Sequence, residues 1–204
     1  MTKKARPRRE PLTAERIYQA ALDLMQETGV EDLSMRKLAS ALGVDAMSIY
    51  HHVENKQALL LGVFQTVLEE VPLPDPPPCD WKQALRELGK GFYVVARRYP
   101  NLFPYMISSP YGTPREREIY QYIRSALQRA GIHEADRLRA TSALYTYGIG
   151  MANVASAGLR LKPLYGEPVP EPDAPEQEPS DADVEFSINL ILAGLEDHIQ
   201  GHKR

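Results

Sequence analysis

Few reactive side chains in this sequence have the spacing of a catalytic or metal site. His198 and His202 are four residues apart and could share a metal on one helix face, but no third ligand is near. Adjacent residues such as His51 and His52 do not face one site on a helix. Cys79 lies among prolines that would not activate its thiol, and no nucleophile elbow, phosphate-binding loop or HExxH motif occurs. The sequence therefore predicts no enzyme, cofactor or metal.

Gly148, Gly150 and Asn153 form part of a dinucleotide-binding pattern. The last glycine of that pattern is missing, and the segment has helical spacing instead of following a strand. Small residues in a helix allow a second helix to approach closely. A helix-packing role is therefore the better interpretation of this segment.

Residues 34–53 contain the clearest functional pattern in the chain. Ser34 can cap a short helix, and Gly43 permits a tight turn after it. Asp45 can cap a further helix that runs to about Val53. Two short helices around a tight turn are typical of a helix-turn-helix. The first of them has apolar residues at helical spacing: Met35, Leu38, Ala39 and Leu42.

The second of these helices, residues 46–53, separates into two faces. Ala46, Ile49 and Val53 point to one side and should pack on the preceding helices. The other side carries polar residues, with Tyr50 at its margin, and a helix of this size fits the major groove of DNA. The outward residues are Met47, Ser48, His51 and His52, and the nearby cations are Arg36, Lys37 and Lys56.

Charge distribution along the chain agrees with a polyanionic partner at the N-terminal end only. The net charge is −3, but residues 1–12 hold five cations against one acid. Residues 163–185 hold eight acids and no lysine or arginine. A basic tail can also serve solubility alone, and helix-glycine-helix patterns occur in ordinary cores. A helical small-molecule-binding or protein-interaction module without DNA readout is therefore the alternative.

Apolar residues follow helical spacing almost throughout, which predicts an all-α fold. Thr13 can cap a first helix, whose stripe of Ile17, Ala20, Ala21 and Leu24 ends at Gly29. A proline run at residues 72–78 cannot continue a helix and separates two domains. We predict a basic arm at 1–12, a helix-turn-helix domain with connecting helix at 13–71, a linker at 72–79, and a ligand-binding and dimerisation domain at 80–204.

The second domain should consist of five helical segments. Asp80 and Thr113 are good caps, and Thr113 is followed by proline and by an acid at the third helical position. Residues 163–180 hold six prolines and many acids, so we predict a mobile loop there. The expected helices span about 81–98, a short piece after Pro100 up to Ile107, 114–130, about 134–161, and a last helix that starts near Ser180 or Asp181 and carries apolar residues to Ile199.

The second domain is also rich in aromatic residues. Such residues form a plain aromatic core or line an apolar pocket with a few polar groups. The candidate ligand-binding residues are Phe92, Phe103, Tyr105, Met106, Tyr145, Tyr147, Met151 and Asn153.

The segment GVEDLSMRKLASALGVDAMSIYHHVENKQALLLGVF resembles the DNA-binding domain of the TetR family of bacterial transcriptional regulators, in the branch of the tetracycline repressors. The resemblance covers about residues 13–64, and beyond them it is one of architecture. The matching elements are Leu33-Ser34, Arg36-Lys37-Leu38-Ala39, Leu42-Gly43-Val44, Ile49-Tyr50, His52-Val53, Asn55-Lys56 and Ala58-Leu59-Leu60.

The resemblance implies roles for individual residues. The sequence departs from the tetracycline-repressor branch at Ala46, Met47 and His51, where bases would be read, so we expect a different operator. The candidate DNA-binding set is Ser34, Arg36 and Lys37 from the second helix, Ala46, Met47 and Ser48 at base edges, and Tyr50, His51, His52 and Lys56 at phosphates or sugars.

The resemblance also implies a small-molecule pocket in the second domain and repression that a ligand relieves. We expect a homodimer in which the last two helices form a four-helix bundle with the partner. Two recognition helices would then meet a near-palindromic double-stranded operator about 34–36 Å apart. No apolar stretch reaches the length of a membrane span, and the single cysteine suits a reducing cytoplasm.

Overall fold

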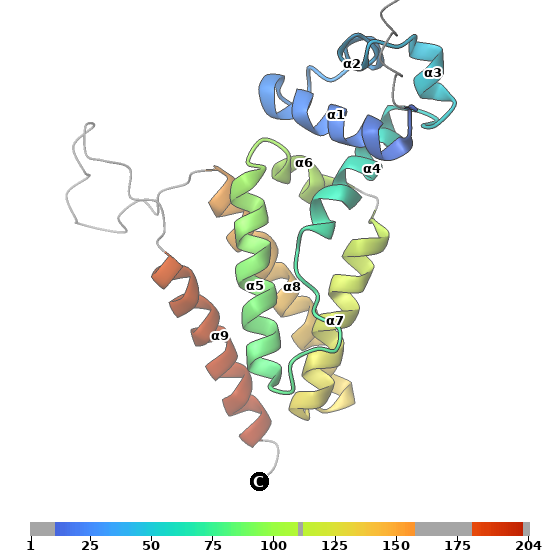
Figure 1. Cartoon of the computed structure of the whole chain (residues 1–204). Coiled ribbons are helices and arrows are strands. Elements are labelled where there is room, and N and C mark those ends of the chain that lie inside the picture. Colours follow the sequence, from blue (N-terminus) through green and yellow to red (C-terminus); the bar gives the residue numbers. More distant parts are fainter. Residues whose placement is uncertain (1–10, 110–111, 158–180, 202–204) are drawn as a thin grey trace, which may run out of the picture. The chain divides into compact units, whose positions relative to one another are not determined.

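The computed structural model describes residues 11–109, 112–157 and 181–201 (Figure 1). Every regular element in these ranges is a helix, which confirms the all-α prediction. The predicted loop at 163–180 and all but two residues of the predicted basic arm lie outside the described ranges. The chain divides into two compact units, Met1–Thr66 and Val67–Arg204, and the division falls inside α4 (Lys56–Glu69), ahead of the proline run.

The N-terminal unit contains α1 (Ala14–Thr28), α2 (Met35–Leu42), α3 (Ala46–Tyr50) and most of α4. The side chain of Thr13 accepts a hydrogen bond from Arg16 N at 3.3 Å and so caps α1 as predicted. α1 packs against α2, and α2 packs against α3. The fully buried side chains of this unit include Ile17, Leu22, Met25, Leu33, Leu38, Ile49 and Leu59.

Two details of this unit differ from the sequence prediction. The buried face of α1 includes Leu22 and Met25, whereas Ala20 and Leu24 are only half-buried. α1 packs on α2, and the ring of Tyr18 lies against Gly62 of α4. α3 ends at Tyr50, short of the predicted Val53, since the chain tightens there before the next helix begins.

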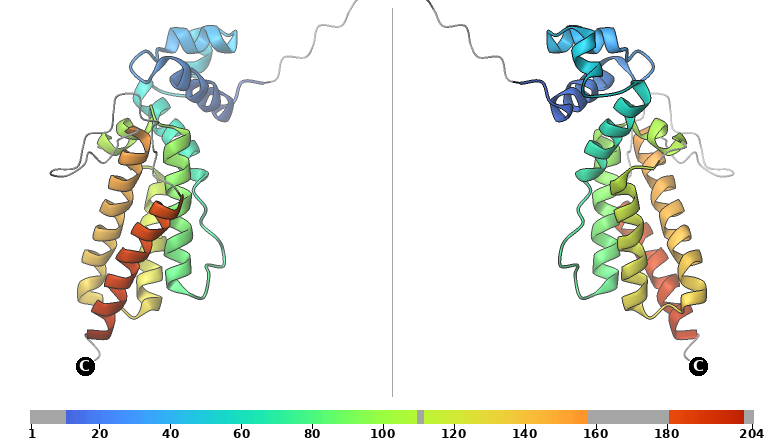
Figure 2. Two further views of the ribbon diagram at one scale, coloured as in Figure 1. Left: turned by 90° about the vertical axis from the view of Figure 1, so that its left-hand side faces the viewer. Right: turned by 90° about the vertical axis from the view of Figure 1, so that its right-hand side faces the viewer.

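The C-terminal unit is a helical bundle (Figure 2). α5 (Trp81–Arg98) packs against α7 (Pro114–Ala130), α8 (Glu134–Ala157) and α9 (Asp181–Gly201), while α6 (Phe103–Ser108) packs against α8. Asp80 caps α5 as predicted, since its side chain accepts from Lys82 N at 2.9 Å, and the Gln83 amide donates to Glu87 one turn further along the helix. In the described ranges, no helix combines the length and apolar character that crossing a bilayer requires.

α9 is fastened to α5 along a polar seam. Lys82 and Lys90 of α5 pair with Glu196 and Glu185 of α9 at 2.5 and 2.7 Å. Between them, Arg86 Nε donates to Asn189 at 3.0 Å. Exposed pairs of this kind contribute little stability each, so the apolar residues behind the seam carry most of the contact.

Candidate nucleic-acid interface and ligand cavity

Local sequence sets the geometry between α2 and α3. Ser34 accepts a hydrogen bond from Lys37 N at 3.2 Å and caps α2. Gly43 takes a left-handed conformation with φ of 64°, and its N–H bonds back to the last turn of α2. Asp45 then accepts from Met47 N at 2.8 Å and starts α3. These three residues produce the tight turn that the sequence predicted.

The helix α3 has one buried face and one exposed face. Ile49 is fully buried and Val53, just beyond the helix, is nearly so, whereas Met47 is 64% and Tyr50 is 45% exposed. Large apolar and aromatic side chains that lie exposed next to each other often mark a surface that a partner covers. Of the other predicted DNA-binding residues, Ser34, Arg36, Lys37, His51, His52 and Lys56 are exposed, and Ala46 and Ser48 are half-buried.

Two of the predicted phosphate-binding cations have contacts within the chain. Lys56 Nζ donates to the carbonyl of Leu33 at 2.7 Å, directly before the start of α2. Lys37 lies 3.6 Å from Asp32 in an exposed ion pair. An ammonium has three donors, so Lys56 can brace the entry to α2 and still reach a phosphate. The sequence did not predict this bracing role, since it depends on a contact between residues distant in the chain.

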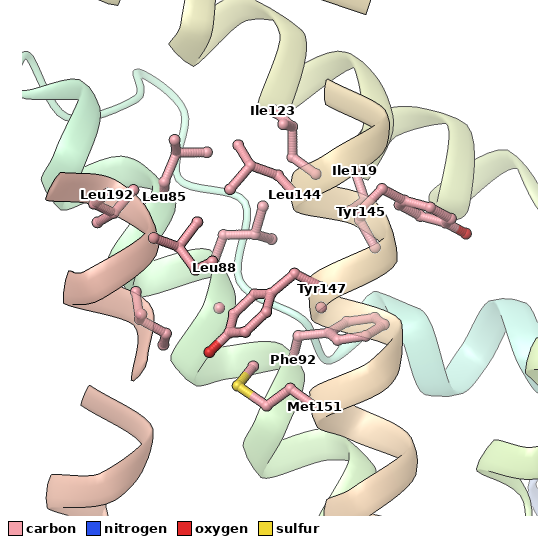
Figure 3. Close-up of a pocket in the computed structure, with 14 residues that line it drawn as sticks. Leu85, Leu88, Phe92, Ile119, Ile123, Leu144, Tyr145, Tyr147, Met151 and Leu192 are labelled. Carbon is pink, nitrogen blue, oxygen red and sulfur yellow. The ribbon is translucent and has the colours of Figure 1, made fainter. Parts of the chain in front are cut away.

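The C-terminal unit contains a partly open apolar cavity between α5, α7, α8 and α9 (Figure 3). About 60 Å³ is open there to the centre of a water-sized sphere. On that measure one water takes roughly 10–15 Å³, so this partly open cavity has room for only a few waters. Its lining residues are Leu85, Leu88, Gly89, Phe92, Ile119, Ile123, Leu144, Tyr145, Tyr147, Gly148, Met151, Ile188, Ile191 and Leu192.

The structure brings half of the predicted ligand-binding residues to this cavity. Phe92, Tyr145, Tyr147 and Met151 line it. Phe103 is instead buried beside it, edge-on to Phe92 with ring centroids 5.4 Å apart. The remaining three lie off the cavity wall: Tyr105 and Asn153 are exposed, and Met106 is half-buried.

The sequence prediction missed most of the lining, because the other wall residues are aliphatic or glycine. Leucine and isoleucine at helical spacing indicate a core in any helical protein, and nothing in one helix marks a gap in that core. The crossing of four helices, which leaves Gly89 and Gly148 in the wall, depends on tertiary packing.

Both tyrosine hydroxyls of the wall have partners within the protein. Tyr147 donates to Ser187 of α9 at 2.7 Å, and Tyr145 donates to the carboxylate of Glu116 at the start of α7. Burial, followed by the neighbouring Glu116 carboxylate, raises the pKa of Tyr145 well above its ordinary value. The hydroxyl therefore remains protonated and can donate a hydrogen bond at any physiological pH.

The order of elements matches known proteins over both units. The family described as "Bacterial regulatory proteins, tetR family" matches residues 17–63, and "Tetracyclin repressor-like, C-terminal domain" matches residues 73–171. This chain belongs to the TetR family. The predicted resemblance, which rested on residues 13–64, is thereby confirmed and extended into the C-terminal unit.

Individual TetR relatives show the degree of similarity. An HTH-type transcriptional regulator of Saccharopolyspora erythraea is 32% identical over 145 residues, which are 71% of this chain but 61% of that relative. The chain therefore spans about 61% of the length of that relative. The class A tetracycline repressor from transposon 1721 of Escherichia coli is 29% identical over 197 residues, or 88% of each protein.

Solved TetR structures share the fold. The Streptomyces coelicolor TetR family protein ActR, crystallised with actinorhodin, superposes with a TM-score of 0.70. The two are 28% identical, and the match covers 91% of this chain and 95% of ActR. The helix-turn-helix unit followed by a helical bundle is therefore the family's arrangement.

Proposed function

We propose that this protein is a sequence-specific DNA-binding transcriptional regulator, and that it represses until a small molecule binds in its cavity. The observation that carries the proposal is the exposed outer face of the helix-turn-helix. There Met47 and Tyr50 lie uncovered on α3, and Arg36 and Lys37 are exposed on α2. A short helix with one packed face and one uncovered face is what a major groove accepts.

A homodimer is the second part of the proposal. α8 and α9 lie along the face turned to the viewer in the left view of Figure 2. On this pair of helices Leu138 is 64%, Phe186 is 70% and Leu190 is 64% exposed. Large exposed apolar side chains of this kind favour a protein interface. A second copy that packs α8 and α9 against its own would bury them and provide the two recognition helices that a near-palindromic operator needs.

The cavity supports an uncharged, largely apolar effector. None of the described residues that line it is charged, and the hydroxyls of Tyr145 and Tyr147 are hydrogen-bonded inside the protein. A charged ligand would lose its hydration there without a counter-charge in the wall. ActR, which is 28% identical, was crystallised with the small molecule actinorhodin, and this supports an organic effector.

We further propose that the protein has no catalytic activity of its own and works in the cytoplasm, where its DNA target would be. The regulator names of its relatives support the first statement. The alternative, a helical small-molecule-binding or protein-interaction module without DNA readout, leaves the exposed face of α3 without a partner.

A gel-shift assay with the DNA that flanks the protein's own coding sequence tests the proposal. We expect a discrete shift that unlabelled specific DNA abolishes at concentrations where unrelated DNA does not. Equal competition by both DNAs, or no shift at low salt, would overturn the DNA-binding assignment.

A further inference from the structure

The hydroxyl of Tyr145 connects the cavity wall to the beginning of α7. It donates to Glu116 Oε1, and in Figure 3 it points away from the other labelled side chains of the wall. Glu116 is the third residue of α7. A hydrogen bond to a carboxylate is stronger than one between neutral groups, so this contact ties the wall firmly to the first turn of α7.

The same Glu116 carboxylate completes the cap of α7. Thr113 Oγ1 accepts from Glu116 N at 3.1 Å, and Thr113 N donates to Glu116 Oε2 at 3.4 Å. One oxygen of this carboxylate thus accepts from Tyr145 in the cavity wall, and the other accepts from the backbone N–H at the start of α7. Without the Tyr145 hydroxyl, the first oxygen loses its donor. The carboxylate can then turn toward another donor, which weakens its bond to Thr113 N in the cap.

Arg115, the preceding residue of α7, holds the end of α4. Its Nη2 donates to the carbonyl of Val71 at 2.8 Å, and its Nε donates to the carbonyl of Leu68 at 3.4 Å. Its Nη1 also pairs with Glu118 at 2.8 Å. The Leu68 carbonyl also accepts from Val71 N at 3.1 Å, and carbonyls at the end of a helix favour a nearby cation. Both bonds are part-buried, and they hold the chain at the last turn of α4 and just beyond it.

We propose that Tyr145 is the side chain through which an occupant of the cavity controls α4. A ligand that widens the small cavity, or that accepts a hydrogen bond from the Tyr145 hydroxyl, breaks the bond between that hydroxyl and Glu116. The first turn of α7 then loosens, and Arg115 holds the Leu68 and Val71 carbonyls less firmly. α4 continues without a break into the helix-turn-helix unit, so its end is where a signal enters. This inference rests on the proposed ligand-responsive function and assigns the residues that carry the response.

Amide hydrogen exchange on the full-length protein, without DNA or ligand, tests the proposal. Tyr145→Phe imitates a ligand that has taken the hydroxyl. The reporters at the end of α4 are the amides of Glu70 and Val71, which bond to the carbonyls of Val67 and Leu68. We expect their exchange to accelerate roughly two- to tenfold, the range that loss of one hydrogen bond gives. The amide of Arg117, which bonds to Thr113, should accelerate as well.

Tyr147→Phe is the matched control, because Tyr147 lines the same cavity but donates to Ser187 of α9. It should leave exchange at Glu70 and Val71 unchanged. Arg115→Gln and the milder Arg115→Lys should each accelerate these two amides, and adding Tyr145→Phe to either should have little further effect there.

Unchanged exchange in Tyr145→Phe, equal acceleration in Tyr147→Phe, or additive effects with the Arg115 variants would each overturn the proposal. The exchange measurement involves no DNA. A failed gel shift would therefore overturn the proposed function without deciding whether Tyr145 controls exchange at Glu70 and Val71.

Discussion

Tyr18 fills the space that any side chain at position 62 would need. A Cβ atom built on Gly62 would lie 2.2 Å from Cε1 of the Tyr18 ring, far inside van der Waals contact. The Tyr18 ring of α1 therefore packs against the backbone of α4, and this packing requires glycine at position 62.

Gly62→Ala should destabilise the N-terminal unit by about 1–2 kcal/mol, because the overpacking strain exceeds the gain in helix propensity. Urea unfolding followed by fluorescence or circular dichroism measures this. Removal of the ring in Tyr18→Ala should cancel the penalty of Gly62→Ala in a double-mutant cycle. Equal costs of Gly62→Ala with and without the Tyr18 ring would contradict the clash.

Arg36→Ala and Tyr50→Ala should each weaken operator binding while the protein stays folded. Contacts of this type contribute about 1–3 kcal/mol, which corresponds to roughly five- to 150-fold in affinity. Fluorescence anisotropy with labelled operator DNA measures the change. Arg124→Ala, an exposed cation on α7, is the charge-matched control and should bind as wild type. Wild-type affinity in both test variants would remove these roles.

Operator affinity should fall steeply as salt concentration rises, because each phosphate contact releases counterions. Lys37→Gln should make the dependence shallower, since Lys37 is exposed on α2 and its ion pair to Asp32 is long, at 3.6 Å. Titrations at several salt concentrations give the slope. A flat dependence in the wild-type protein would speak against phosphate binding altogether.

Leu190→Glu or Phe186→Glu should convert the proposed dimer to a monomer, because a carboxylate placed in an apolar interface loses its hydration without a partner. Light scattering at micromolar concentration gives the mass. Val94→Glu is the control, since Val94 is 52% exposed on α5, outside the α8–α9 face. A monomeric wild-type protein, or dimeric variants, would refute the interface.

Stability should fall as pH rises above 10, the ordinary value from which the pKa values of Tyr99, Tyr122 and Tyr145 are raised, chiefly by burial. The unfolded chain ionises these tyrosines near that pH while the folded protein keeps them neutral, so alkali favours unfolding. Thermal melts across this range should show a shallower decline for Tyr145→Phe than for wild type. Parallel declines would mean that Tyr145 ionises as easily folded as unfolded.

Neutral 2-naphthol should raise the melting temperature of the protein, whereas anionic 2-naphthoate should not, because no lining residue carries a charge. Gly148→Leu should abolish the effect by filling the cavity. Gly148→Ala should retain most of it, since a Cβ there only reaches ordinary contact with Phe92 at 3.9 Å. A shift with naphthoate alone would reverse the assignment of the effector class.

The sequence predicted the local features of the fold well. Thr13, Ser34, Asp45 and Thr113 cap the helices that follow them, because capping depends on residues two or three positions away. The helix-turn-helix was equally readable, since its turn and its two faces lie within twenty residues of sequence.

Features that join distant segments were not predicted. The Tyr145–Glu116 bond spans 29 residues, and the Arg115–Val71 bond spans 44. Each depends on how two helices align, which spacing within one helix does not encode. For the same reason, the aromatic content identified only part of the cavity wall, and its aliphatic part became visible only in the folded bundle.

Arg115 grips α4 through main-chain carbonyls, which every amino acid possesses. The contact between Arg115 and the end of α4 therefore requires no particular side chains at that end. The one requirement is apolar character at Leu68 and Val71, which are buried. Helix-turn-helix segments from relatives, joined beyond this point, would present the same pair of acceptor carbonyls to Arg115. We therefore expect this junction to tolerate the exchange of one helix-turn-helix segment for another, which would change the DNA that is read while the cavity stays the same.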